Sequence, residues 1–261
     1  VSVLLPALGA AREGAKSLKT LASMQQTMLA YNTRTVEYKD ELLFGYMPGN
    51  VYGQVPSVTL PTGAKVHGFP VQRYPLRLAE YQGDAWEMIF VHQPTPPLPS
   101  PGDPDLFTEA YQLGLTPSFG INATFVGGDH GLAGFKLQGG RYVPNTGGPA
   151  IFKVHEARRP GELIVFAETQ QFNGIDHADG AGLHFVRPPM LSSRVWRGEG
   201  GRVELTTPGF MTGVPIARFG RGVPTGFLDG HAEAMAPEDL DDMRLWENDA
   251  DRADASAYFT P

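Results

Sequence analysis

Several aspartates and histidines lie close together along the chain and could act in acid–base or metal chemistry. These groups are Asp129 with His130, Asp176 with His177 and Asp179, His184, and Asp229 with His231. Such side chains form hydrolytic metal centres in many enzymes. The sequence contains no His-Glu-x-x-His or Gly-x-Ser-x-Gly motif and no phosphate-binding glycine loop that would anchor a catalytic site. Because Asp and His at turns commonly form local hydrogen bonds instead, we expect that the protein is not an enzyme.

Acidic loops in the last third of the chain are candidates for calcium binding, since Ca²⁺ takes carboxylate and carbonyl oxygens as ligands. The candidate ligands are Asp176, Asp179, Glu247, Asp249 and Asp251. Their spacing matches no established calcium loop, so a solvated acidic surface is the alternative interpretation. We expect no cofactor other than this Ca²⁺.

Composition excludes several further classes of function. The chain has 261 residues, a formal net charge of −7 and no cysteine. The acidic balance, with no basic cluster, argues against a nucleic-acid partner. The lack of cysteine excludes thiol catalysis, thiolate metal sites and disulfides. The 32 glycines and 23 prolines predict a turn-rich body with short strands.

The first forty residues predict one long helix, around which the other elements are organised. Good helix formers dominate it, and its apolar residues recur at helical spacing. This stripe contains Leu4, Leu8, Ala11, Ala15, Leu18, Ala22 and Leu29, with Leu21, Met24 and Met28 beside it. Residues 1–11 are almost wholly apolar but too few to cross a bilayer, which takes about 20 residues. An ordinary amphipathic helix packed on its own domain is one interpretation.

The remaining chain predicts short elements separated by Gly and Pro. We expect the first helix to end between Tyr38 and Leu43, and residues 93–104, with six prolines, to form an extended surface loop. The expected elements are short β runs over 51–71, a helix over 73–84, strands near 119–125 and 162–168, a hairpin joining 225–228 to 231–235 through Asp229-Gly230, and a short helix over 237–246.

The segment Leu4-Leu5-Pro6-Ala7-Leu8-Gly9-Ala10-Ala11-Arg12-Glu13 resembles the end of the N-terminal helix of type IV pilin-like and type II secretion pseudopilin-like proteins. The similarity is greatest to a large planctomycete-type group. Shorter segments at 74–81, 118–122, 159–168 and 226–231 are also similar to that group. Phe219 stands where the group has a His ahead of the Asp-Gly-His motif.

The resemblance implies an α+β, pilin-like fold in which a long N-terminal α-helix packs on an antiparallel β-sheet with Gly/Pro-rich loop insertions. Residues 1–40 would be the soluble half of the pilin helix, and residues 41–261 a globular β-rich head. A basic leader and an apolar anchor would precede Val1, so we expect that the chain is truncated at its N-terminus. The family's processing residues lie in that upstream segment and have no counterpart here.

The function implied by the resemblance is that of a structural subunit of a type IV pilus-like or type II secretion pseudopilus filament. Its partners would be other pilin or pseudopilin subunits, a prepilin peptidase and an inner-membrane assembly platform. The precursor would be anchored in the inner membrane, with a periplasmic or extracellular head. The filament-assembly residues would be Leu4, Leu5, Pro6, Leu8, Ala11 and Ala15. Small neighbours such as Gly9 and Gly14 would permit close helix approach.

A second hypothesis is a soluble envelope or secreted module that binds a ligand such as a carbohydrate. Its contacts would include Trp86, Trp196 and Trp246. Isolated aromatic residues are more often part of a core, which favours the filament hypothesis.

Overall fold

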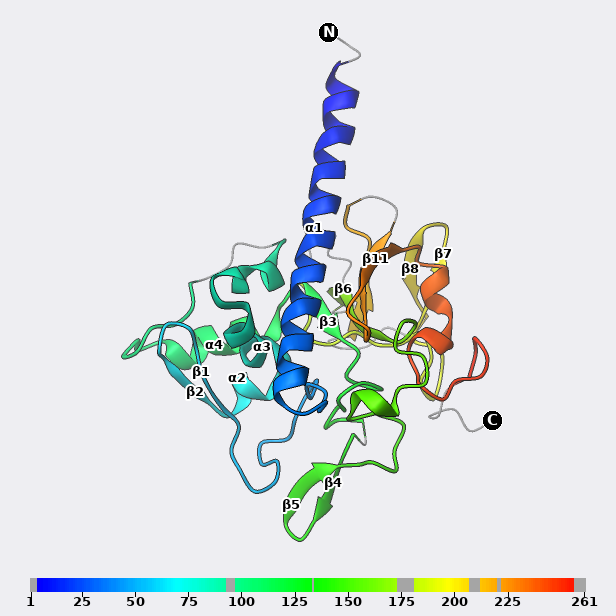
Figure 1. Ribbon diagram of the computed structural model, residues 1–261. Helices are drawn as coiled ribbons and strands as arrows, with labels where there is room; N and C mark the ends of the chain where they lie inside the picture. The colour runs from blue at the N-terminus through cyan, green and yellow to red at the C-terminus, as the bar shows by residue number, and fades with distance from the viewer. Residues whose placement is uncertain are drawn as a thin grey trace.

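The chain is a mixed α+β protein with one long N-terminal helix and antiparallel sheets, as Figure 1 shows. The computed structural model describes residues 4–92, 97–132, 134–172, 181–206, 212–219 and 222–255. Helix α1 spans Leu4–Glu37. Lys39 and Asp40, both at positive φ, turn the chain away from it. The long helix and the α+β class are therefore confirmed, and the helix ends one residue before the predicted range.

The central sheet is built around strand β6, Ile164–Phe172. Its other strands are β3 (Phe119–Ile121), β9 (Thr212–Pro215), β10 (Val223–Phe227) and β11 (Ala232–Met235). Strands β11, β10, β6 and β3 follow one another in that order, β9 also pairs with β6, and all pairs are antiparallel. Ala167 lies between Gly120 and Thr225, and residues 164–167 are fully buried. The apolar run predicted as a buried strand is thus the centre of the sheet.

Helix α1 packs against strand β10, and Gly226 of β10 lies where the two elements come closest. A Cβ atom at Gly226 would lie 2.5 Å from Met28 Sδ and 3.1 Å from Met24 Sδ. The ring of Tyr31 meets Phe166 of β6 edge-on at 5.6 Å. Because Gly226 has no side chain, the two methionines of α1 reach the sheet itself.

A helical layer lies beside the sheet and packs on the same, head-facing side of α1, on the left in Figure 1. It consists of α2 (Phe69–Gln72), α3 (Tyr74–Gln82), the 3-10 helix η1 (Gly83–Phe90) and α4 (Leu106–Leu115), with the small hairpin of β1 (Ser57–Thr59) and β2 (Lys65–His67) beside it. Helix α3 confirms the helix expected over 73–84. Helix α4 was not predicted, and it follows the proline-rich segment.

Two further hairpins turn at glycine doublets. Strands β4 (Phe135–Gln138) and β5 (Arg141–Pro144) join at Gly139-Gly140, and β7 (Trp196–Glu199) and β8 (Arg202–Leu205) join at Gly200-Gly201. All four glycines have positive φ, as two-residue hairpin turns of this kind require. The hairpin of β10 and β11 turns at Asp229-Gly230 as predicted, with Gly230 at φ 100°.

The prediction of one helix over residues 237–246 is wrong. The structure has two short 3-10 helices instead, η3 (Asp239–Asp241) and η4 (Met243–Leu245), and a third, η2 (Val154–Glu156), lies elsewhere. The carboxylate of Asp242 accepts a hydrogen bond from the backbone N–H of Arg244 at 2.9 Å. This local bond starts a new turn at Asp242 and competes with a continuous helix.

Candidate functional site: the outward face of the first helix

The face of α1 that packs on the head is lined by hydroxyl, methionine and tyrosine side chains. Its buried residues are Thr20, Ser23, Met24, Thr27, Met28, Ala30, Tyr31, Arg34 and Thr35. Four of these hydroxyls donate to the carbonyl four residues earlier, at 2.8–2.9 Å, as in Ser23 to Lys19 and Thr27 to Ser23. These four hydroxyls therefore keep a hydrogen bond within the helix when the face is buried.

The apolar stripe predicted from the sequence lies on the opposite side of α1 and faces away from the head. Leu18 is 70% exposed and Leu29 61%, and Ala22 between them is also exposed. Val36, which is 75% exposed, extends the predicted stripe toward the end of the helix. At about 100° per residue these four side chains fall on the side of the helix opposite Thr20, Thr27 and Tyr31. The helix does pack on its own domain over residues 20–35, but through a different face from this stripe.

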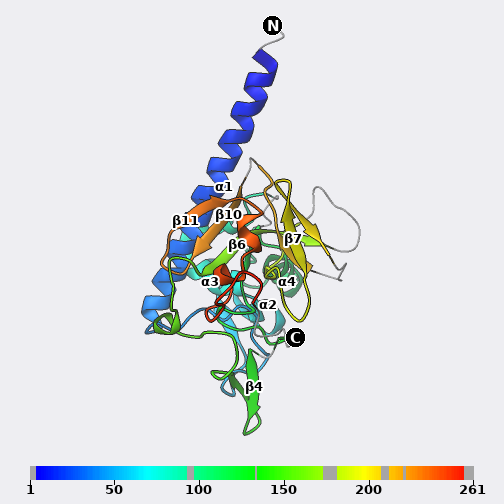
Figure 2. The same cartoon turned by 90° about the vertical axis from the view of Figure 1, so that its right-hand side faces the viewer.

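The N-terminal half of α1 forms a stem that stands clear of the head in both views (Figures 1 and 2). Leu8 is 69% exposed, and Ala11 and Ala15 are exposed on the same side as Leu18. Cβ atoms at Gly9 and Gly14 would have no atom within 4 Å. We define the outward stripe as Leu8, Ala11, Ala15, Leu18, Ala22, Leu29 and Val36. It runs along the stem and the head-bearing half of the helix.

The remaining candidate assembly residues, Leu4, Leu5 and Pro6, begin α1, but their side chains lie outside the described residues. Lys16 marks where the head begins to meet the stem, because its ammonium lies 4.8 Å from the centroid of the Phe219 ring. In the described part of the chain, no helix is both long and apolar enough to span a membrane.

The Asp and His residues of these groups that the structure describes occupy structural positions. Asp129 is buried, accepts from the backbone N–H of Gly131 and pairs with Arg187 at 2.8 Å. His231 Nδ1 lies 2.6 Å from Asp229 Oδ1 in the β10–β11 turn. Residues 176, 177 and 179 lie outside the described residues. Among the residues that the structure describes, no group of three or more His, Asp or Glu side chains could hold a metal ion.

His184 is a buried core residue of the head. Burial, with Arg73, Arg187 and Arg77 nearby, holds the pKa of its imidazole well below the usual value. The ring lies edge-on to Tyr46, with the centroids 5.7 Å apart. A neutral, buried imidazole of this kind packs as part of the core. It lacks the solvent access of the metal ligand that the sequence analysis considered.

The three predicted calcium ligands that the structure describes lie in different environments. Glu247 is buried, Asp251 is exposed, and the exposed Asp249 pairs with Arg158 at 3.2 Å. Asp176 and Asp179 lie outside the described residues. The structure does not bring the described three into one group that could hold a metal ion.

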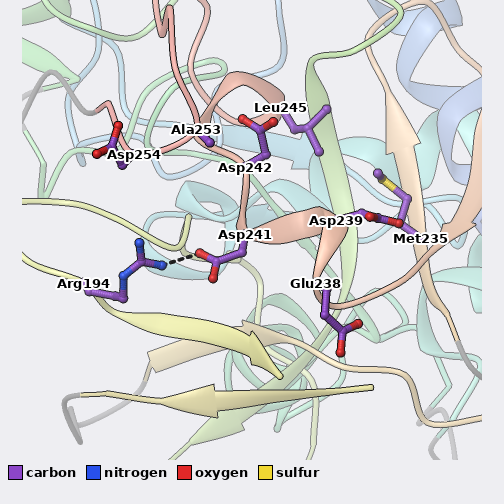
Figure 3. Close-up of a pocket in the computed structure, with 9 residues that line it drawn as sticks. All are labelled: Arg194, Met235, Glu238, Asp239, Asp241, Asp242, Leu245, Ala253 and Asp254. Atoms are coloured by element: carbon purple, nitrogen blue, oxygen red, sulfur yellow. Dashed lines mark hydrogen bonds and ion pairs between the residues drawn. The ribbon is translucent and has the colours of Figure 1, made fainter. Parts of the chain in front are cut away.

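Other carboxylates line a pocket of about 590 Å³ that sequence reasoning missed (Figure 3). Its acidic residues are Glu238, Asp239, Asp241, Asp242 and Asp254. Most of these carboxylates have partners: Asp241 pairs with Arg194, Asp242 with Arg244, and Asp254 with Arg252. The hydrogen bond from Arg244 lowers the pKa of Asp242, and one from the backbone of Gly201 lowers that of Glu238. The acidic run 237–242 is the sequence signal that could have pointed to the pocket.

Trp86, Trp196 and Trp246 are all buried, so the interpretation of these tryptophans as ligand contacts is wrong. Trp196 and Trp246 pack edge-to-face at 6.0 Å, and their indole N–H groups donate to the carbonyls of Arg187 and Leu240. They form the second core of the head, between the central sheet and the C-terminal 3-10 helices.

No family model, no curated protein and no solved structure matches the chain.

Proposed function

We propose that the protein is a structural subunit of a type IV pilus-like or type II secretion pseudopilus filament and assembles through helix α1. The observation that carries the proposal is the position of the outward stripe. Its apolar residues run along the helix on the side away from the head, from Leu8 to Val36. The head leaves this face unburied, so it is free for neighbouring helices to cover.

Burial of this face by neighbouring helices is energetically favourable. Removing a Leu or Val side chain from water contributes about 1.5–3 kcal/mol when the burial is complete. The alanines at 11, 15 and 22 permit close approach of a second helix. Because the head lies on the opposite side of α1, several helices can gather around one axis with their heads pointing outward and without steric conflict.

The long helix packed on an antiparallel sheet supports a pilin-like interpretation of the fold. In this proposal an apolar segment precedes Val1 and anchors the precursor in the inner membrane. A prepilin peptidase processes the precursor, and an inner-membrane platform assembles it with other pilin or pseudopilin subunits. The head is then periplasmic or extracellular, and the protein has no catalytic role.

The mass and N-terminal sequence of the protein isolated from its own cells test this proposal. We expect an N-methylated Phe followed by an apolar stretch that continues into Val1-Ser2-Val3. A mature protein that begins at or near Val1 would contradict the proposal.

A further inference from the structure

A second pocket lies at the end of the molecule remote from the stem, beside the β4–β5 hairpin at the bottom of Figure 1. Its volume is about 290 Å³. Four chain segments form it: residues 41–44 after α1, the turn at Tyr52, the hairpin with the residues up to 146, and residues 152–156. Backbone hydrogen bonds hold the segments together, from Leu42 N to Phe152 O at 2.8 Å and from Tyr52 N to Tyr142 O at 2.9 Å.

The floor of this pocket is aromatic. Phe44 and Phe152 line it and are both buried, with ring centroids 6.1 Å apart. Phe135 packs edge-to-face against both rings, at 5.3 and 6.0 Å. Val143 adds an aliphatic wall. The floor therefore suits an apolar group about as large as one aromatic or branched side chain.

The pocket is lined by two lysines, Lys136 and Lys153, and by two glutamates, Glu41 and Glu156. Lys136 and Lys153 are exposed, and neither has an ion-pair partner among the described residues. The carboxylate of Glu156 is already bound, because it accepts the backbone N–H groups of Phe152 and Lys153 at 2.6 and 3.0 Å. Glu41 contributes the one other carboxylate of the lining.

Tyr52 adds a hydrogen-bond donor to the rim. Partial burial, with the charge of Glu41 nearby, raises the pKa of its phenol. A phenol is protonated at neutral pH, so Tyr52 can donate to an anionic group.

Tyr52, which lines the pocket, has an unusual backbone conformation. Within the described part of the chain, the non-glycine residues with positive φ are Lys39, Asp40 and Tyr52, at 53°, 66° and 53°. Tyr52 lines the pocket, and the other two directly precede Glu41. Such conformations are costly and persist where the surrounding structure enforces them, commonly at ligand sites.

We propose that this pocket binds a small carboxylic acid with an aromatic or branched apolar body. The apolar body lies on Phe44 and Phe152, and the carboxylate lies between Lys136 and Lys153 and accepts from Tyr52. Ligand pockets in proteins have volumes upward of about 300 Å³, and this pocket lies at that lower limit. Its ligand is therefore limited to roughly the size of one amino acid. This binding function is additional to filament assembly and does not depend on it.

A titration of the isotope-labelled chain with N-acetylphenylalanine, followed by two-dimensional NMR, tests the proposal. We expect saturable shifts confined to residues 41–52 and 135–156, with a Kd on the order of 1 mM, as for a ligand of this size. N-acetylphenylalaninamide, which lacks the carboxylate, should bind at least about fivefold more weakly. Absence of saturable shifts, or equal binding of acid and amide, would overturn the proposal.

The double variant Lys136→Gln, Lys153→Gln tests whether these two lysines bind the carboxylate of the ligand. It should weaken binding of the acid by about five- to tenfold and leave binding of the amide unchanged. Lys65→Gln, at an exposed lysine on the distant strand β2, is the matched control and should bind like the parent chain. Unchanged affinity in the double variant, with thermal unfolding like that of the control, would also overturn the proposal.

Discussion

Gly226 shows at the scale of one residue how the head and the helix fit together. Its backbone lies directly under Met24 and Met28, and a Cβ atom there would overlap Met28 Sδ. In the stem the situation is reversed, since Gly9 has free space around it. The two glycines therefore have different roles, although the sequence alone does not distinguish them.

We predict that Gly226→Ala destabilises the protein by about 1–3 kcal/mol, because the added methyl group overpacks the helix–sheet contact. Gly9→Ala, the matched control, should leave the free energy of unfolding unchanged or raise it by up to about 1 kcal/mol, since Ala is the better helix former. Urea unfolding followed by circular dichroism measures both. Equal stability of the Gly226→Ala variant and the parent would contradict the packing described for α1 and β10.

His184 gives the fold a predictable pH dependence. Its folded-state pKa lies well below the ordinary value of 6.5, so the unfolded chain binds a proton there that the folded chain does not. The contribution of neutral His184 to stability is fully present above about pH 6.5 and falls as the pH drops below it, by at most about 1.4 kcal/mol per pH unit. The parent should thus lose more stability between pH 7 and pH 5 than His184→Gln does. Parallel Tm profiles of the two proteins would contradict this account.

At the scale of elements, α1 is a helix with two different faces. One face uses Thr, Ser, Met and Tyr side chains to pack on the head, and the other carries the outward stripe. Apolar periodicity identified the helix correctly but pointed to the wrong buried face. The reason is that Thr20, Ser23 and Thr27 are polar by type but are satisfied by carbonyls of the same helix.

We predict that the two faces respond oppositely to the same type of substitution. Leu18→Gln and Leu29→Gln should each change the free energy of unfolding by no more than about 0.5 kcal/mol, because both side chains are exposed. Met28→Gln, on the buried face, should cost about 2–5 kcal/mol, as for other losses of core packing. Thermal unfolding of the three variants provides the comparison. A cost at Leu29 similar to that at Met28 would mean that the outward stripe packs on the head.

Other elements were predictable where local chemistry decides the structure. The Asp229-Gly230 turn, the glycine doublets and the apolar run over 163–167 each specify their conformation through turn geometry or burial. Helix α4 and the strands of the β4–β5 and β7–β8 hairpins were missed, because their patterns are short and tertiary contacts determine them. The pocket beside the β4–β5 hairpin joins segments distant in sequence, so no local pattern contained it. The acidic pocket is formed mainly by residues 235–254, where the acidic run is a local signal.

At the scale of the whole molecule, the stem, the outward stripe and the head are arranged for assembly. The head lies on one side of α1 (Figure 2), and the residues of the outward stripe recur on the other side from Leu8 to Val36. The β4–β5 hairpin and its pocket lie at the end remote from the stem. The helix can therefore serve assembly while the far end of the head stays available to a ligand.

Cysteine cross-linking of the full-length protein in its own cells tests the central claim most directly. The chain contains no native cysteine, so Ala22→Cys places one thiol in the outward stripe and Ser192→Cys, the control, places one on the exposed surface of the head. A short bismaleimide should link copies of the Ala22→Cys protein to one another, because neighbouring helices pack about 8–10 Å apart. The Ser192→Cys protein should remain uncrosslinked under the same conditions. A monomeric Ala22→Cys protein, expressed and folded like the parent, would contradict assembly through this face.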